Sequence, residues 1–326
     1  MNTVRTAESV AIGHPDKICD QISDAILDAC LMQDPHTRAA IEVVGGHGQM
    51  WVVGELTTEA NIDPVALAHQ VCQEVGCSEA LDIRSTIVRQ SSEIARGVDA
   101  AGAGDQGIMV GYACADTSEL LPLEVVLARR LTQAMGARDG KAQVTVRDGT
   151  VQEVITSVCG KVEQEVFVTE VKNIVAPYLP PHQRLADVWR ANPNGAWSVG
   201  GFAADTGLTG RKLAVDCYGP HIPLGGGCFS GKDGTKVDRS GAYMARRIAV
   251  DYLRARGAQE VFVHLAYAIG MTEPRMAIVT IDGTTEPVTG YDLRPRAIIE
   301  QLQLTIPCFR NTAAQGHFGA GQRWDV

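Results

Sequence analysis

The sequence has no long hydrophobic run. No segment approaches the roughly 18 uninterrupted apolar residues that a membrane-spanning helix needs. The first residues, MNTVRTAESVAIGHPDK, lack the apolar core of a signal peptide. We therefore expect a protein without a membrane partner.

The sequence also lacks the cysteine patterns of a zinc site or of a disulfide framework. Its 9 cysteines are scattered and odd in number, and they form no CxxC pair and no Cys/His metal spacing. We interpret them as reduced, mostly structural thiols, which is typical of a cytoplasmic protein.

Basic residues are in short supply. The chain has 29 Lys and Arg against 38 Asp and Glu, so its net charge is −9. This balance argues against a general nucleic-acid or anionic-membrane surface. Any anion that binds must be held by a local basic pocket. At 326 residues, with 45% apolar and 21% charged residues, the chain is otherwise typical of a globular protein with two or three domains.

The most informative stretch is Gly13-His14-Pro15-Asp16-Lys17. Pro15 suits a first helical position, so His14, Asp16 and Lys17 should lie at a helix N-terminus, where backbone amides favour an anion. An ordinary capped helix start is the alternative interpretation. The residues that follow with helical spacing predict one apolar face, and three aspartates should face water. The apolar positions are Ile18, Ile22, Ala25, Ile26 and Ala29; the aspartates are Asp20, Asp24 and Asp28.

Hairpins and helices alternate along the first half of the chain. Residues 37–58 predict a hairpin, 64–75 a helix, 84–90 and 108–114 strands, 122–135 a helix, 137–158 a hairpin turning at Asp148-Gly149, and about 163–175 a helix. This order favours α+β layers over a parallel-sheet βαβ protein. Glu42 and Glu55 interrupt the apolar runs of the first hairpin, and surface placement is the usual fate of a strand glutamate. The alternative for Glu42 is burial, because it lies in a run that looks buried on both faces.

Residues 91–107 form a glycine-rich stretch with little hydrophobic periodicity. Gly102-Ala-Gly-Asp-Gln-Gly107 matches the dinucleotide fingerprint, but no strand precedes it and no helix follows, so we reject that interpretation. A mobile loop that covers the substrate is the better hypothesis.

The second half carries a cluster of cations among glycines. Residues 205–212 should lead into a strand at 213–219, and residues 225–240 should precede a helix. The run at 226–232 fits the P-loop pattern, but Asp233 stands where a P-loop has Ser or Thr and the helix begins too late. The cations that suit a polyphosphate are Arg211, Lys212, Lys232, Lys236 and Arg239. Asp238 is either a Mg²⁺ ligand or an ion-pair partner.

The last segment predicts strands at 259–270 and 275–282 and a helix at 295–303. We interpret His317 and Phe318, in the tail, as packing residues only.

Taken together, GHPDK, GAGDQG, GLTGRK and GGGCFSGKDGTKVDRS resemble S-adenosylmethionine synthetases (methionine adenosyltransferases) over nearly the whole chain. The resemblance implies that methionine sulfur attacks C5′ of ATP and that the released tripolyphosphate is hydrolysed to pyrophosphate and phosphate. It also implies three similar α/β domains with mixed or antiparallel sheets in a pseudo-threefold arrangement, with interleaved segments. The implied parts are 1–90, a gating loop at 91–101, 102–196 and 197–326.

The resemblance assigns roles to particular residues. The implied catalytic residues are His14, Lys17, Arg211 and Lys232. The implied ATP and triphosphate ligands are Asp105, Asp139, Lys141, Trp197, Arg211, Lys212, Lys232 and Lys236. The implied methionine ligands are Glu55, Gln90, Asp205, Lys236 and Ile269. Asp16 and Asp238 would bind Mg²⁺, two ions per site, and Glu42 would lie near K⁺. A homodimer with active sites between subunits, or a tetramer, is also implied.

The chain departs from the family pattern in its loops. The loop before GAGDQG is short, and Val158-Cys-Gly-Lys-Val stands where the family has Ser-Thr-Gln-His. We therefore expect synthesis activity with altered loop kinetics. A P-loop-like kinase or ATPase and a silent regulatory subunit are the rival hypotheses.

Overall fold

The computed structural model describes residues 3–77, 79–90, 102–160, 165–319 and 321–325. The gating loop expected at 91–101 lies outside these residues, as do the first two positions of the helix expected at 163–175. Among the described residues, no helix combines the length and the apolarity that crossing a membrane requires.

Three sheets of four strands form the frame, which bears out the α+β prediction. The first has the order β4 (Asp82–Val88), β3 (Gln49–Thr57), β2 (Arg38–Gly46), β9 (Gly207–Leu208). The second has the order β1 (Val4–Val10), β6 (Gly140–Arg147), β7 (Thr150–Val158), β8 (Trp189–Ala191). The third has the order β12 (Thr284–Pro287), β11 (Met276–Ile281), β10 (Glu260–Tyr267), β5 (Gly107–Cys114).

Each sheet is completed by a strand from a distant part of the sequence. β1 pairs with β6, β5 pairs with β10, and β9 pairs with β2, all antiparallel. The sheets are mostly antiparallel, with parallel pairs only where β3 meets β4 and β7 meets β8 among the described residues. The expected interleaving of chain segments is therefore confirmed.

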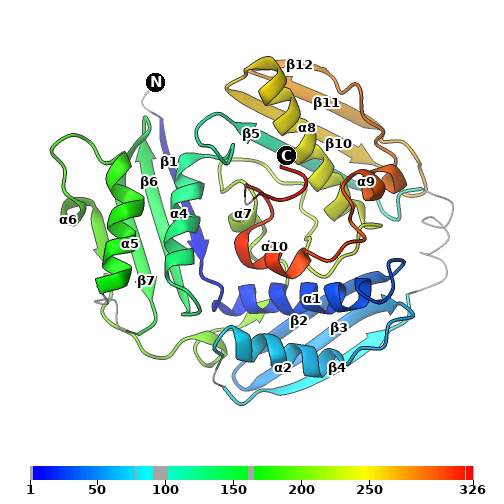
Figure 1. Cartoon of the computed structure of the whole chain (residues 1–326), viewed down its shortest axis with the longest axis horizontal. Helices are drawn as coiled ribbons and strands as arrows, with labels where there is room; N and C mark the ends of the chain where they lie inside the picture. The colour runs from blue at the N-terminus through cyan, green and yellow to red at the C-terminus, as the bar shows by residue number, and fades with distance from the viewer. Residues whose placement is uncertain (1–2, 78, 91–101, 161–164, 320, 326) are drawn as a thin grey trace.

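Helices cover the sheets in pairs. α1 (Pro15–Leu31), α4 (Leu123–Ala134) and α8 (Val237–Arg256) each pack on one sheet, and α2 (Pro64–Glu74), α5 (Glu165–Val175) and α9 (Pro295–Gln301) lie beside them. Each sheet with its two helices forms one unit, and the units are numbered like the sheets. Figure 1 shows the short helices α7 (Leu213–Asp216) and α10 (Phe309–Gln315) near the centre, between the three units. The short elements α6 (Leu185–Val188), η1 (Ala176–Tyr178) and η2 (Gly201–Ala203) lie in connections. One hydrophobic core joins the first and third units, and the second has its own.

The strand predicted at 213–219 is wrong. Residues 213–216 form the helix α7, and Asp216 there is buried against α1. The helix predicted at about 295–303 is confirmed as α9, which ends at Gln301; Gln303 adopts a φ of 52° that an α-helix does not allow.

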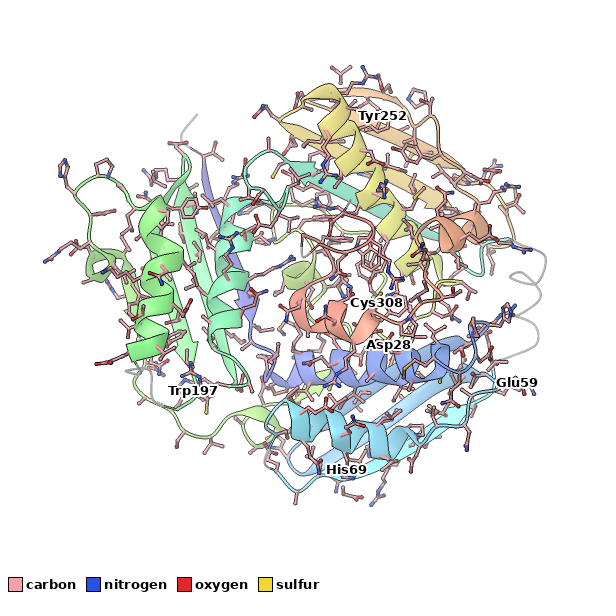
Figure 2. All side chains as sticks on the ribbon, viewed as in Figure 1. Asp28, Glu59, His69, Trp197, Tyr252 and Cys308 are labelled. Carbon is pink, nitrogen blue, oxygen red and sulfur yellow. The ribbon has the colours of Figure 1, made fainter. Side chains whose placement is uncertain are left out.

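The aspartates of α1 do not face water, contrary to the sequence prediction. Asp20 and Asp24 are buried, and Asp28 is partly buried. Each accepts backbone hydrogen bonds from a distant segment: Asp20 from Gly210, Asp24 from Gly231, and Asp28 from residues 308–310 at the start of α10. Figure 2 shows Asp28 close to Cys308. The buried carboxylates of α1 therefore hold three distant segments: the loops that contain Gly210 and Gly231, and the start of α10.

Asp20 gives a pH-dependent test of this arrangement. Burial raises the pKa of Asp20 to about 8. Between its ordinary value of 3.8 and about 8, the folded protein holds an extra proton there, so this group's contribution to the free energy of unfolding decreases as pH rises. Asp20→Asn keeps an oxygen acceptor for Gly210 and cannot ionise, so the variant should gain stability relative to the parent protein as pH rises from about 5 to about 9. Urea unfolding at both pH values measures this; a pH-independent difference would contradict it.

Candidate functional site

The N-terminus of α1 places His14 at a helix entrance, as the sequence predicts. Pro15 is the first helical residue, and His14 is the N-cap, with its Nδ1 accepting a hydrogen bond from the backbone N–H of Asp16 at 3.2 Å. Because Nδ1 is an acceptor, the neutral ring carries its proton on Nε2. His14 therefore presents a hydrogen-bond donor from a fixed position.

The surroundings of His14 favour its neutral form. Burial, followed by the cations Lys212 and Lys141, lowers the pKa of His14 to about 4, against the opposing effect of Asp16 and Asp205. Its side chain is only 4% exposed. At neutral pH the imidazole can donate a proton in a hydrogen bond without carrying charge itself.

Asp16 joins α1 to the GLTGRK segment. One carboxylate oxygen accepts a hydrogen bond from the Leu208 amide at 2.9 Å and lies 3.3 Å from the Arg211 guanidinium; the other pairs with Lys212. Burial raises the pKa of Asp16, but Lys212 and Leu208 outweigh it and leave the pKa below its ordinary value. Four implied site residues thus meet at one helix end: His14, Asp16, Arg211 and Lys212.

Lys17 belongs to the same helix turn but points to a different partner. Its ammonium is buried and pairs with Asp216 of α7. Asp216 is a site neighbour that the sequence analysis missed, because residues 213–219 were assigned to a strand. Helical spacing along α1 relates Lys17 only to its own helix neighbours, such as Gln21 and Asp24, and so it does not indicate a partner as distant in sequence as Asp216.

A cavity of about 410 Å³ lies beside the entrance of α1. Gly13 and Asp139 line it, together with Gly201, whose N–H donates to Asp139 at 2.9 Å. Trp197 is partly buried, and its carbonyl accepts a hydrogen bond from the N–H of Gly160, which also lines this cavity. Figure 2 places Trp197 between the second unit and the first. Lys141 is exposed, at the start of β6.

A second basic cluster lies two helical turns further along α1. Lys232 follows Gly231, whose N–H donates a hydrogen bond to Asp24. Asp24 lies eight residues beyond Asp16, a distance of about 12 Å along the helix axis. The Lys232 ammonium lies 2.7 Å from Asp238, and Lys236 pairs with Asp233 at 2.6 Å. The ion-pair interpretation of Asp238 therefore describes the structure without ligands.

Arg239 does not belong to this cluster, contrary to the sequence prediction. Its guanidinium is fully buried, donates to both oxygens of Asp24 at 2.7 Å, and lies 4.2 Å above the ring of Phe309. It therefore joins α8 to α1 and α10 and is closed to a polyphosphate. His317 and Phe318 are buried, as predicted: His317 bonds to Tyr243, and Phe318 stacks on Tyr218.

The carboxylate of Asp238 lies in a cradle that only glycine permits. A Cβ at Gly227 would come within 2.1 Å of one Asp238 oxygen and 2.6 Å of the other. No group of three or more His, Cys, Asp and Glu residues within the described ranges could hold a metal ion. Mg²⁺ commonly uses one or two carboxylates and completes its shell with water and substrate phosphates. Asp16 and Asp238, single carboxylates that each pair with a lysine, fit that mode.

Gly227→Ala tests the cradle. The new methyl group meets only the mobile end of the Asp238 side chain, so the fold should persist while the carboxylate is displaced. We expect a fall in kcat/KM of about 100-fold, the cost of misplacing a site group by an ångström. Gly225→Ala is the contrasting variant, because its Cβ would lie 1.6 Å from the backbone oxygen of Ile108 and should disrupt folding. Steady-state kinetics and circular dichroism separate the two; a fully active Gly227→Ala would contradict the cradle.

Glu42 and Glu55 lie on the open face of the first sheet. Glu42 is exposed and Glu55 is partly exposed, so the surface placement expected of a strand glutamate is confirmed, and the alternative, burial of Glu42 in a run covered on both faces, is wrong. Val44, Trp51 and Val88 are also exposed on these strands. The outer face thus mixes carboxylates with uncovered apolar side chains.

Of the other implied substrate ligands, Gln90, Ile269 and Asp105 lie away from His14, whereas Asp205 lies close enough for its charge to act on the pKa of His14. Gln90 donates its N–H to Thr57, and its buried side-chain oxygen has no hydrogen-bond partner among the residues that the structure describes. The segment at residues 269–271 is hydrogen-bonded to the segment that begins at 102, because the N–H of Gly270 donates to the carbonyl of Ala103. Ile269 in the first segment and Asp105 in the second are both exposed. No hydrogen bond or ion pair among the described residues connects this group to His14 or Lys212 within one chain.

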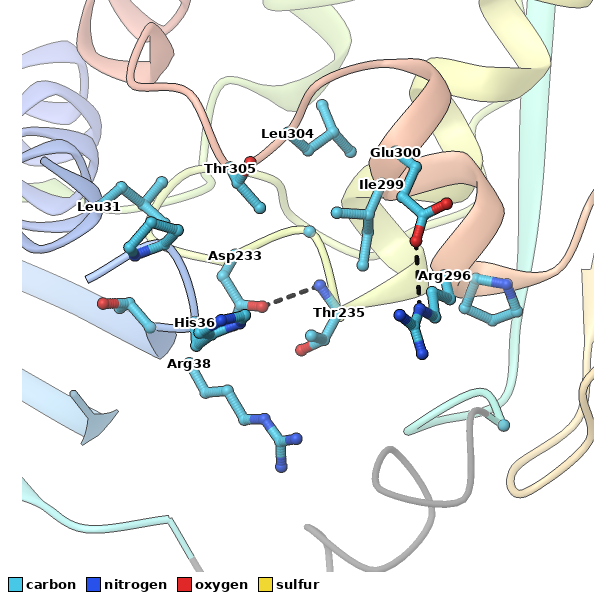
Figure 3. Close-up of a pocket in the computed structure, with 15 residues that line it drawn as sticks. Leu31, His36, Arg38, Asp233, Thr235, Arg296, Ile299, Glu300, Leu304 and Thr305 are labelled. Carbon is cyan, nitrogen blue, oxygen red and sulfur yellow. Dashed lines mark hydrogen bonds and ion pairs between the residues drawn. The ribbon is translucent and has the colours of Figure 1, made fainter. Parts of the chain in front are cut away.

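Another cavity abuts the second basic cluster. It measures about 510 Å³, within the range of roughly 300–1,000 Å³ typical of ligand pockets. Figure 3 shows its walls: His36 and Arg38 before and on β2, Asp233 bonded to Thr235, and Arg296 paired with Glu300 on α9. Since Asp233 also pairs with Lys236, the cavity and the cluster share a wall.

Comparisons with known proteins cover nearly the whole chain. Three family models match in order: "S-adenosylmethionine synthetase, N-terminal domain" at residues 2–96, "central domain" at 100–196 and "C-terminal domain" at 199–325. A protein of a Nitratiruptor species with the name S-adenosylmethionine synthase is 42% identical, over 96% of this chain and 92% of its own length. A protein of Prochlorococcus marinus with the same name is 41% identical, over 97% and 93%.

Proposed function

The chain belongs to the S-adenosylmethionine synthetase family, and we propose that it joins ATP to L-methionine by attack of the methionine sulfur on C5′ of ATP. The whole triphosphate leaves and is then hydrolysed to pyrophosphate and phosphate. The observation that carries the proposal is the neutral, buried His14 at a helix N-terminus among cations. In our proposal the chain divides into 1–90, 91–101, 102–196 and 197–326.

Displacement at C5′ places negative charge on the leaving oxygen. We assign the Nε2–H of His14 as the donor to that oxygen, because a preorganised donor costs no reorganisation as charge develops. Arg211 and Lys212, beside it, would bind the triphosphate, as would Lys232 and Lys236 of the second cluster. Lys17, also proposed as catalytic, would act through the buried network with Asp216 that holds this helix end.

Both ends of the substrate pair have proposed contacts. Asp139, Lys141 and the ring of Trp197 would receive ATP at the cavity beside Gly13, and Asp105 would contact the adenosine. Methionine would be held by Glu55, Gln90, Asp205, Lys236 and Ile269. The unpartnered buried oxygen of Gln90 supports a ligand there, because such an atom is costly to leave unsatisfied.

Metal ions are part of the proposal. Asp16 and Asp238 would hold two Mg²⁺ with phosphate oxygens, and Glu42 would lie near a K⁺. When bound, the cations would neutralise triphosphate charge. The side chains of Lys212 and Lys232, which pair with these carboxylates here, would then turn toward the phosphates.

The separation of the two residue groups supports a homodimer with its active sites between subunits, or a tetramer of such dimers. The first group centres on His14, and the second includes Glu55 and Gln90 on the open sheet face. The exposed Val44, Trp51 and Val88 give that face an apolar surface to bury. Mixing inactive His14→Ala and Glu55→Ala subunits tests this, since hybrid dimers regain one intact site only if each site spans two chains.

A product assay tests the reaction itself. The protein is incubated with ATP, methionine, Mg²⁺ and K⁺, and nucleosides and phosphates are separated by chromatography. S-adenosylmethionine with pyrophosphate and phosphate is the expected result. ADP would instead indicate a kinase or ATPase, and no product at any protein concentration would favour a silent partner subunit.

A further inference from the structure

The end of α2 brings two cysteines together. The helix terminates in a Schellman motif: Gly76 adopts a φ of 74°, its N–H donates to Gln73, and the N–H of Cys77 donates to the carbonyl of Cys72 at 2.8 Å. This motif characteristically places the two outer side chains in contact. Here both are cysteines, and their thiols are hydrogen-bonded to each other.

The backbone bond fixes a spacing that a disulfide can span. Because a Cα lies about 1.5 Å from its own nitrogen and about 2.4 Å from its own carbonyl oxygen, a 2.8 Å bond keeps the two Cα atoms within about 7 Å, the upper limit for a disulfide. The backbone separation of Cys72 and Cys77 therefore lies within the range that a disulfide can bridge.

The two thiols differ in access and in acidity. Cys77 is partly buried and lines the 410 Å³ cavity beside Gly13 and Asp139, whereas Cys72 is only 5% exposed and belongs to the core. The hydrogen bond from Cys72 lowers the pKa of Cys77 to about 7, and the same contact together with burial raises the pKa of Cys72. Cys77 thus carries thiolate at neutral pH and faces open space, as an oxidation-sensitive cysteine must.

We propose that Cys77 is a site of oxidation by hydroperoxides and that Cys72 resolves it to an intramolecular disulfide. The Cys77 thiolate attacks one peroxide oxygen and the O–O bond breaks, giving a sulfenic acid; the leaving oxygen takes up a proton and departs as water from hydrogen peroxide, or as an alcohol from an organic hydroperoxide. The Cys72 sulfur then attacks the sulfenic sulfur, its proton leaves with the hydroxyl group as water, and the disulfide forms. The two thiols supply both electrons that reduce the peroxide. Closing this bond keeps oxidised or mixed-disulfide groups on Cys77 out of the cavity that Asp139 lines.

The sequence offers a direct readout. After Arg38, the next Lys or Arg is Arg84, so trypsin releases residues 39–84 with Cys72 and Cys77 as their only cysteines. The reduced full-length protein is treated with hydrogen peroxide, alkylated and digested. We expect this peptide to lose the mass of two hydrogens and to resist alkylation, and dithiothreitol to reverse both changes.

Single variants separate the two roles. Cys72→Ser should leave Cys77 as a sulfenic acid that reacts with dimedone, or as a stable mixed disulfide after oxidised glutathione. Cys77→Ser should leave Cys72 reduced. Cys159→Ser, which removes another thiol lining the same cavity, is the matched control and should form the disulfide like the parent protein. Two alkylatable thiols in the 39–84 peptide after peroxide treatment would overturn the proposal, whatever the outcome of the product assay.

Discussion

His14→Ala should lower kcat/KM for S-adenosylmethionine formation by about 100- to 1,000-fold, the usual effect of removing one preorganised donor to a developing oxyanion. The fold should survive. The residue also caps α1, and loss of a cap costs about 1 kcal/mol of unfolding free energy. Steady-state kinetics and urea unfolding on the same preparation measure both effects.

His14→Asn is the matched control, because asparagine is a strong N-cap but does not reproduce the reach of Nε2–H. It should fold like the parent protein and remain inactive. If His14→Asn recovered activity, or if His14→Ala unfolded, His14 would be a helix-start residue and not the catalytic one.

The pH dependence of His14 follows from its lowered pKa. The unfolded chain takes up a proton near pH 6.5 and the folded protein only near 4, so this group destabilises the fold as pH falls through that interval. The neutral donor itself should persist down to about pH 5. The ratio of kcat/KM between the parent protein and His14→Ala should therefore stay constant as pH falls through 6.5. A pH–rate profile of both proteins measures this ratio.

Asp24→Ala should destabilise the protein by about 3–5 kcal/mol, because it leaves the guanidinium of Arg239 buried without its counter-charge. It also removes the acceptor for the Gly231 amide, so the segment that carries Lys232 loses its anchor on α1. Urea unfolding followed by circular dichroism gives the free energy.

An exposed ion pair of the same kind provides the comparison. The side chains of Arg296 and Glu300 on α9 are 80% and 67% exposed, and Glu300→Ala should cost less than about 1 kcal/mol. The double variant Asp24→Leu with Arg239→Met should recover part of the loss, since it removes both buried charges together. An Asp24→Ala protein as stable as the Glu300→Ala protein would mean that the buried pair contributes nothing.

The sequence predicted the local features well. The start of α1 at Pro15, the start of α2 at Pro64 and the turn at Asp148-Gly149 all appear in the structure, because each depends on residues close in sequence. The spacing of aspartates on α1 looked like a solvated face for the same reason. Their partners lie 190 to 280 residues away, and helical periodicity does not report backbone amides that arrive from other segments.

The site was predictable only as a set of motifs. GHPDK and GLTGRK meet at Asp16, and the glycine-rich run at 225–236 forms the second cluster, but spacing gave no reason to separate Arg239 from its basic neighbours. Its burial depends on Asp24 and Phe309, on two other elements. The partners of Lys17 and Arg239 therefore required tertiary structure.

The exchange of strands between sheets bears on how the chain folds during synthesis. Val4 pairs with Arg147, and Gly107 pairs with Tyr267, so a growing polypeptide presents β1 and β5 long before their neighbours leave the ribosome. Such distant pairings slow folding, and the waiting strand edges can join other chains. The nascent protein should therefore depend on molecular chaperones. Truncation after residue 90 or after residue 196 should leave an aggregating fragment instead of a folded domain.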